Sequence, residues 1–184
     1  MKSMNPERNR RVLIIDDNKA IHSDFRKILS PDEPTRAALN LTEAALFGNP
    51  VNEEQQPQFE IASAYQGPDG VTRVEEAFAA GRPYAMAFVD MRMPPGWDGI
   101  KTAQELLKVD PEIQIVICTA YSAYSSNEIS EQIGNSDRMA TLKKPFDTVE
   151  ALRLANALTE KWWLVHFDIK KTQRLALKFK ERKE

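Results

Sequence analysis

Short apolar segments alternate along the chain with longer segments in which apolar residues recur every three or four positions. The short segments cover 12–15, 59–64, 85–89, 113–118 and 139–142. Apolar segments of this length, rich in β-branched and aliphatic residues, are typical of strands whose two faces are both covered. The pattern therefore predicts five strands of one buried sheet.

The segments between and after these strands have the spacing of amphipathic helices. The first predicted helix lies between Asn18 and Pro31, where Ile21, Phe25 and Leu29 repeat at helical intervals. Further helices are predicted over 70–80, 99–108 and 128–133, and a last one from Thr148 towards Glu184. The residues of the second helix expected to face the core are Val71, Val74, Ala77 and Phe78.

Strands that alternate with helices imply an α/β fold in which a parallel sheet carries helices on both faces. Residues 31–57, between the first predicted helix and the second predicted strand, interrupt this alternation. They are rich in proline and acidic residues and are interpreted as an insertion. Because they lie far in sequence from Asp90, the polar residue that follows the third predicted strand, we expect them to form a decoration or a docking surface.

Charge and cysteine content narrow the possible functions. The formal net charge of −2 argues against a general nucleic-acid or membrane-coating protein. The apolar run that follows the basic N-terminal residues ends at Asp16, which is too short for a secretory signal, and no run approaches a membrane span. The single cysteine, Cys118, cannot form an internal disulfide, which fits a reducing compartment. We expect a cytoplasmic protein without direct nucleic-acid or membrane binding.

Polar side chains suited to one reaction follow four of the predicted strands. The carboxyl ends of parallel strands lie along one edge of a doubly wound sheet, where ligands bind. The residues concerned are Asp16 and Asp17, Asp90, Thr119, and Lys144. Clustered carboxylates repel one another unless a cation joins them, and oxygen ligands with open positions suit Mg²⁺. With a carboxylate as nucleophile and a lysine and a hydroxyl to stabilise phosphoryl oxygens, these residues form a phosphoryl-acceptor set.

Four sequence blocks carry a resemblance to a known family. They are Val-Leu-Ile-Ile-Asp-Asp-Asn at 12–18, Phe-Val-Asp-Met-Arg-Met-Pro at 88–94, Ile-Cys-Thr-Ala at 117–120 and Leu-Lys-Lys-Pro-Phe at 142–146. In order and spacing they resemble the chemotaxis-receiver-like receiver domains of response regulators in two-component signalling, over about residues 10–160. The resemblance implies a flavodoxin-like, doubly wound sheet of five parallel strands in the order 2-1-3-4-5.

The resemblance also implies how the acidic residues divide the work. Asp90 would be the phosphoacceptor and one of the groups around Mg²⁺. Asp17 would bind the metal directly, and Asp16 would reach it through water. The backbone carbonyl of Arg92 would be a further metal ligand.

The remaining residues of the set would act on the phosphoryl group itself. Thr119 would form a hydrogen bond with it, and Lys144 would pair with it, aimed by a cis peptide bond between Lys144 and Pro145. Two local features depart from the common family pattern. The loop 93–99 is one residue longer, and Thr141 occupies a position where the family usually has the aromatic residue that reports phosphorylation.

Other interpretations of the same residues exist. Asp16 and Asp17 could merely cap the following helix, and Thr119 could be an ordinary strand-end hydroxyl. Cys118 is expected to pack in the core as a small apolar residue. A pseudo-receiver, which binds partners without being phosphorylated, is the first alternative function, and the intact acceptor set argues against it. An aspartyl-phosphate hydrolase would carry a second aspartate where this sequence has Arg92.

We therefore expect residues 1–159 to form a receiver that is phosphorylated on Asp90 by a sensor histidine kinase or phosphotransfer protein. The domain would need Mg²⁺, would signal to an output domain or partner, and would not be a turnover enzyme. Because His22 and His166 lie on separate predicted helices, neither is expected to bind a metal or to carry phosphate.

The helical pattern continues past the receiver as an arm, residues 160–184. Along the last predicted helix, which includes this arm, mostly apolar residues recur at alternating spacings of four and three, which defines a heptad seam. The seam consists of Ala151, Ala155, Leu158, Trp162, Val165, Ile169, Thr172, Ala176 and Phe179. We expect the arm to form a coiled coil in a homodimer and to lead into an output domain of a larger signalling protein. The alternative is a solvated helix face or tail.

Overall fold

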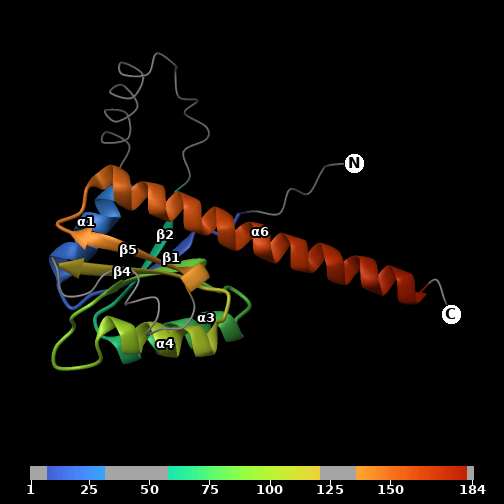
Figure 1. Cartoon of the computed structure of the whole chain (residues 1–184), viewed down its shortest axis with the longest axis horizontal. Helices are drawn as coiled ribbons and strands as arrows, with labels where there is room; N and C mark the ends of the chain where they lie inside the picture. The colour runs from blue at the N-terminus through green and yellow to red at the C-terminus, as the bar shows by residue number, and fades with distance from the viewer. Residues whose placement is uncertain (1–7, 32–57, 121–135, 182–184) are drawn as a thin grey trace, which may run out of the picture.

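The computed structural model of the chain describes residues 8–31, 58–120 and 136–181, with side chains up to residue 166. Apart from Pro31, the predicted insertion at 31–57 lies outside the described residues, and so does the predicted helix at 128–133. The described part contains a single parallel sheet of five strands in the order β2-β1-β3-β4-β5. The sheet lies between two layers of helices (Figure 1). The predicted flavodoxin-like order is confirmed.

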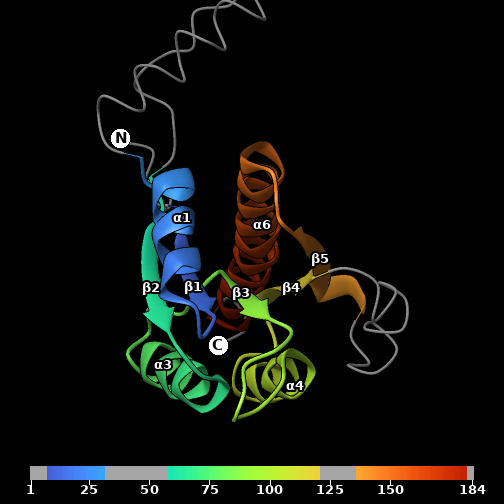
Figure 2. The same cartoon turned by 90° about the vertical axis from the view of Figure 1, so that its left-hand side faces the viewer.

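All five predicted strands are present, and their ends differ from the predicted ones by at most two residues. The strands are β1 (Arg11–Ile15), β2 (Glu60–Ala64), β3 (Met86–Asp90), β4 (Gln114–Ala120) and β5 (Met139–Lys144). The helices are α1 (Lys19–Leu29), α3 (Gly67–Ala79), α4 (Gly99–Val109) and α6 (Thr148–Glu181), with a short 3₁₀ turn η2 (Ser136–Arg138) before β5. Figure 2 shows α1 and α6 on one face of the sheet and α3 and α4 on the other.

Two hydrophobic layers hold these helices on the sheet, because successive side chains of a strand point to opposite faces. In β1, Leu13 and Ile15 pack with residues of α3 and α4, whereas Val12 and Ile14 pack with residues of α1 and α6. In the second layer, the ring of Phe25 on α1 lies 4.4 Å from that of Phe88 on β3. The continuous apolar runs are therefore explained by burial on both faces.

Helix α3 differs from its prediction in two respects. It begins at Gly67, three residues early, because Pro68 in the first turn needs no hydrogen-bonded N–H and has a suitable φ. Phe78, predicted to face the core, is 51% exposed. Helical periodicity gives the direction of a side chain but not the extent of the neighbouring layer, and Phe78 lies in the last turn of α3, after the buried Val74 and Ala77.

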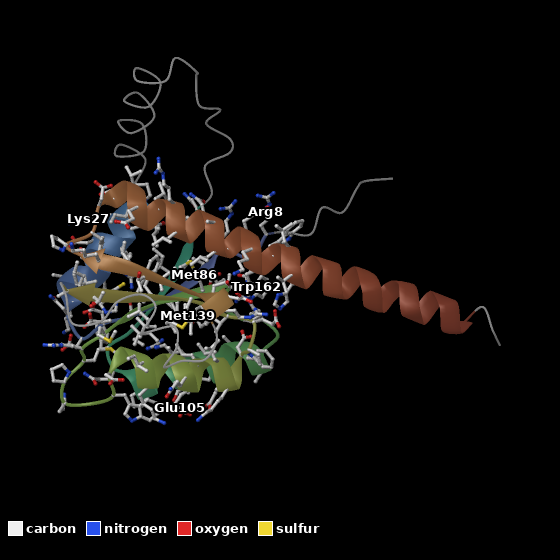
Figure 3. All side chains as sticks on the ribbon, in the orientation of Figure 1. Arg8, Lys27, Met86, Glu105, Met139 and Trp162 are labelled. Carbon is white, nitrogen blue, oxygen red and sulfur yellow. The ribbon has the colours of Figure 1, made fainter. Side chains whose placement is uncertain are left out.

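Helix α6 shows that half of the predicted seam is buried within the chain itself. Ala151 and Ala155 are fully buried, Leu158 packs partly against the same core, and Trp162 is 7% exposed. In Figure 3, Trp162 lies on the side of α6 that faces the sheet. The prediction of one continuous stripe for a partner helix is therefore wrong up to Trp162, because these residues are buried or partly buried within the chain itself.

Polar contacts also hold α6 near its middle. Arg8 forms an ion pair with Glu160, 2.7 Å between Nη1 and Oε2, and its guanidinium lies 5.4 Å from the centre of the Trp163 ring. Lys161 donates a hydrogen bond to the carbonyl of Asp137 in η2. Helix α6 passes without a break through the predicted boundary at 159/160. Among the described residues, no helix has the length and apolar character needed to cross a membrane.

Candidate functional site

The sheet register brings three carboxylates together at the carboxyl end of the central strands. Ile15 of β1 pairs with Val89 of β3, so the residues that follow them, Asp16 and Asp90, lie side by side. Asp17 comes next along the chain. Asp16, Asp17 and Asp90 each offer a carboxylate oxygen, and these three oxygens lie within 4.8 Å of one another. The clustering expected from the strand ends is therefore present.

Lys144, at the end of β5, lies between two of these carboxylates. Its Nζ is 2.6 Å from Asp16 Oδ2 and 2.8 Å from Asp90 Oδ1. The three side chains are only 19%, 4% and 12% exposed, in the order Lys144, Asp16, Asp90. The peptide bond between Lys144 and Pro145 is cis, as expected. A partly buried ammonium thus compensates charge that the acidic cluster would otherwise carry alone.

Burial and pairing act in opposite directions on these groups. Burial raises the pKa of Asp90 above its ordinary value, although the hydrogen bond from Lys144 opposes the change. Burial by itself lowers the pKa of Lys144, but its hydrogen bonds to Asp16 and Asp90 outweigh burial, so the pKa is raised. The lysine therefore stays charged at neutral pH. The negative charge of Asp90 is less favourable than that of a carboxylate in water, because the effect of burial exceeds that of pairing with Lys144.

The loop after β3 wraps closely around Asp90. The backbone of Arg92 forms a hydrogen bond with the Asp90 carboxylate, and the N–H of Met91 donates to the carbonyl of Cys118, 2.9 Å away. A Cβ atom at Gly99 would lie 2.6 Å from the Asp90 carbonyl oxygen, so only glycine lets α4 start this close to the acceptor loop. Cys118 is buried, as expected, and burial raises the pKa of its thiol.

Thr119 is near this edge, but its hydroxyl points elsewhere in this structure. It lies one residue beyond Cys118, the register partner of Asp90, and its Oγ1 donates to the carbonyl of Ala120, 3.0 Å away. Thr141 lies opposite Ile117 in the β4–β5 ladder. The predicted contact of Thr119 with a phosphoryl group and the predicted metal contact of the Arg92 carbonyl both remain predictions.

Sequence reasoning missed a hydrogen-bonded group behind Asp16. His22 of α1 contacts the backbone carbonyl of Asp16 (Nε2, 2.7 Å) and the hydroxyl of Ser63 on β2 (Nδ1, 3.0 Å). Arg26 donates to the same hydroxyl, 2.8 Å away. One signal was available, since His22 shares the inward face of α1 with Phe25, and a polar residue on an apolar face needs a partner.

The donor set fits a divalent cation of the Mg²⁺ type. Such ions prefer oxygen ligands and keep several waters, so they need only a few carboxylates. Asp17 is exposed, whereas Asp16 and Asp90 are already engaged with Lys144. The cluster therefore combines an open carboxylate for a cation with a partly buried one, Asp90, that can act as a nucleophile towards an electrophilic phosphorus.

Comparison with known proteins gives a family and one curated relative. The model of the response regulator receiver domain matches residues 47–156. Sporulation initiation phosphotransferase F of Bacillus subtilis (strain 168) is 30% identical over 105 residues, which are 57% of this chain and 75% of that protein. The match to the family model includes Asp90, Thr119 and Lys144. It leaves out Asp16 and Asp17, which the sheet register brings beside Asp90.

Solved structures show the same fold at low sequence identity. Adenylate cyclase from Rhodopirellula baltica superposes with a TM-score of 0.66 at 19% identity, covering 90% of this chain and 98% of that one. A CheY-like response regulator receiver domain protein from Methanospirillum hungatei has a TM-score of 0.57 at 19% identity, covering 84% and 96%. The signal receiver domain of an HD domain-containing protein from Pseudomonas fluorescens has a TM-score of 0.60 at 14% identity, covering 92% and 98%.

Proposed function

The chain belongs to the response regulator receiver family, and on this premise we propose that it is a phosphorylation switch whose acceptor is Asp90. A sensor histidine kinase or a phosphotransfer protein would supply the phosphoryl group in the cytoplasm, and an output domain or partner would respond to it. The observation that carries the proposal is the meeting of Asp16, Asp17, Asp90 and Lys144 at one edge of the sheet.

The proposed reaction is a simple displacement at phosphorus. A carboxylate oxygen of Asp90 forms a bond to phosphorus while the bond from phosphorus to the donor's imidazole nitrogen breaks. The electron pair of the broken bond stays on the leaving nitrogen, which takes up a proton from solvent, so the products are an acyl phosphate on Asp90 and a neutral donor histidine. The Nζ of Lys144 lies 2.8 Å from Asp90 Oδ1, so it is close enough to form an ion pair with an oxygen of a phosphoryl group on Asp90. Thr119 is proposed as a second donor to the phosphoryl group.

Mg²⁺ is the proposed cofactor, with Asp17 and Asp90 as direct ligands and Asp16 as a ligand through water. The Arg92 carbonyl is the fourth proposed contact. When bound, the ion would neutralise charge that accumulates on the phosphoryl oxygens. The proposal is supported by the three close carboxylates, whose mutual repulsion a divalent cation relieves.

The function is tested by exposing the purified chain to acetyl phosphate and following the intact mass. We expect the mass increase of one phosphoryl group in the presence of Mg²⁺ and none in excess EDTA. Hydroxylamine should remove the label, because it cleaves acyl phosphates. A chain that folds but is never labelled, with acetyl phosphate or with a panel of histidine-phosphorylated donors, would favour the pseudo-receiver alternative.

Removing the exposed carboxylate should weaken metal binding without damaging the fold. Asp17→Ala is expected to lower Mg²⁺ affinity and labelling together, because it deletes a proposed direct ligand. In EDTA the same variant should melt at a slightly higher temperature than the parent, since one of three mutually repelling charges is gone.

Calorimetric titration with Mg²⁺ and thermal melting in EDTA measure the two effects of Asp17→Ala. Asp24→Ala is the matched control, because Asp24 is an exposed acid of α1 outside the cluster. Unchanged Mg²⁺ affinity in Asp17→Ala would remove Asp17 from the proposed ligand set.

We also propose that two copies of the chain associate through the distal part of α6. The seam residues up to Trp162 are buried or partly buried within the chain, so only the heptad positions of the sequence from Val165 onward are left for pairing. A seam of about two heptads gives only weak association, because short helices are marginal by themselves.

Sedimentation over a concentration series tests this pairing. The full chain should associate as concentration rises, whereas a chain ending at His166, which keeps Trp162 in place, should stay monomeric. Monomeric behaviour of both proteins would reject the pairing. Equal association of both would move the interface onto the receiver.

A further inference from the structure

His22 is buried beneath the loop that carries Asp16 and Asp17, two of the three acids of the cluster. It is 3% exposed on the inner face of α1, which lies beside β1 and β2 at the carboxyl end of the sheet (Figure 2). The ring of Tyr65 covers it, with 4.7 Å between ring centres. Its two ring nitrogens reach Asp16 at the end of β1 and Ser63 in β2. One side chain thus ties together α1, β1 and β2.

The hydrogen-bond partner of Nε2 defines the role of that nitrogen. A carbonyl oxygen can only accept, so Nε2 of His22 must donate to Asp16. The Ser63 hydroxyl accepts from Arg26, which leaves its own hydrogen available for Nδ1 of His22. Hydrogen bonds therefore connect Arg26, Ser63, His22 and Asp16 in one series.

His22 completes the hydrogen bonding of Asp16. The Asp16 N–H donates to the carbonyl of Ala64, 3.2 Å away. Its carboxylate accepts from the N–H of Asn18 (2.8 Å) and from Lys144 (2.6 Å). The carbonyl that His22 holds belongs to the peptide group between Asp16 and Asp17. The contact with His22 therefore sets the plane from which Asp17 leaves the strand.

We propose that His22 is a positioning residue of the acceptor site, which holds the Asp16–Asp17 peptide so that both carboxylates face the cation. This role rests on the proposed phosphoryl-acceptor function. His22 makes no contact with the reacting atoms, and it acts through the backbone of Asp16. Groups that orient metal ligands in this way typically change metal affinity or activity about 10- to 100-fold when they are removed.

Two amide variants distinguish a hydrogen-bond donor at the position of Nε2 from one at the position of Nδ1. In His22→Gln the amide nitrogen is as many bonds from Cα as Nε2, so it can still donate to Asp16. In His22→Asn the amide nitrogen corresponds to Nδ1, so it can reach only Ser63. We expect His22→Asn to weaken Mg²⁺ binding, measured without any phosphodonor, by about tenfold and to slow labelling by acetyl phosphate. His22→Gln should recover most of both losses.

The control is a buried residue on the same helix far from the cluster. Leu29→Ala, in the last turn of α1, removes a fully buried side chain and should lower the melting temperature clearly while leaving Mg²⁺ affinity unchanged. If His22→Asn binds Mg²⁺ like the parent, or if His22→Gln is as impaired as His22→Asn, the positioning role is wrong.

The same measurements keep the two proposals apart. If the parent is labelled and Asp90→Asn is not, the acceptor function is upheld, whatever the His22 variants do. If the parent neither binds Mg²⁺ nor becomes labelled, the acceptor function and the His22 role both fail. If the parent binds Mg²⁺ without being labelled, the metal titrations of the variants still decide the role of His22.

Discussion

Asp90→Asn is expected to abolish labelling by acetyl phosphate while the protein stays folded. An amide has nearly the shape of the carboxylate but is not a nucleophile towards phosphorus. Lys144 keeps its second partner, Asp16, 2.6 Å away, and the variant also loses a carboxylate whose pKa burial raises. Intact mass after incubation with acetyl phosphate and Mg²⁺ measures the effect, and circular dichroism checks the fold.

A matched control for this variant is Asp98→Asn. Asp98 caps α4 at the end of the same loop by accepting from the N–H of Lys101, and asparagine caps helices equally well. This control should be labelled like the parent. Labelling of Asp90→Asn to the parent level would show that another residue accepts the phosphoryl group, and peptide mapping would then identify it.

Lys144→Met is expected to destabilise the metal-free protein by about 3 kcal/mol, because it leaves the buried carboxylate of Asp16 and the partly buried one of Asp90 without their counter-charge. Labelling should also be lost, since the proposed partner of the phosphoryl group is gone. Chemical denaturation in EDTA measures the stability change, and Mg²⁺ should restore part of it by supplying positive charge. Lys143→Met is the control, because Lys143 is an exposed lysine of the same strand.

The pH dependence of this loss has a definite sign. In the parent, the raised pKa of Lys144 makes its contribution fully present below its ordinary pKa of 10.5 and lost as pH rises through the higher folded value. The raised pKa of Asp90 means that its ionisation costs stability as pH rises from its ordinary value of 3.8. Without Lys144 that cost grows.

The deficit of Lys144→Met should therefore be largest near neutral pH and shrink as acid protonates the carboxylates. Denaturation curves in EDTA from neutral to acidic pH test this trend against the parent and Lys143→Met. A deficit that stays constant over this range would assign it to lost packing of the lysine stem, and the electrostatic explanation would be rejected.

The positions of the strands and of most acidic site residues followed from simple physical patterns. Continuous apolar runs predict strands because both faces of the sheet are covered, and polar residues that end such runs must gather at one edge. The residue-by-residue register between strands did not follow, because the pairing of Ile15 with Val89 depends on the whole sheet. The salt bridges of Lys144 with both Asp16 and Asp90 are likewise a property of the folded chain.

Two incorrect predictions, for Phe78 and for the first half of the α6 seam, share one physical cause, and the omission of His22 has the reverse cause. Phe78 and the first half of the α6 seam were judged from helical periodicity alone, which cannot show what lies opposite a helix face. His22 was overlooked for the reverse reason, since its partners are a backbone carbonyl and a serine distant in sequence. Periodicity describes one element at a time, whereas these contacts arise between elements.

The unbroken course of α6 has a mechanical consequence. Its 34 residues form a rod about 51 Å long, anchored on the sheet at its start and by Trp162 and Glu160 near its middle. From Trp162 to Glu181 the helix extends about 28 Å, so a tilt of about 5° at Trp162 displaces Glu181 by about 2.5 Å. The length of α6 beyond Trp162 would therefore convert a small shift of packing on the sheet into a larger displacement at Glu181.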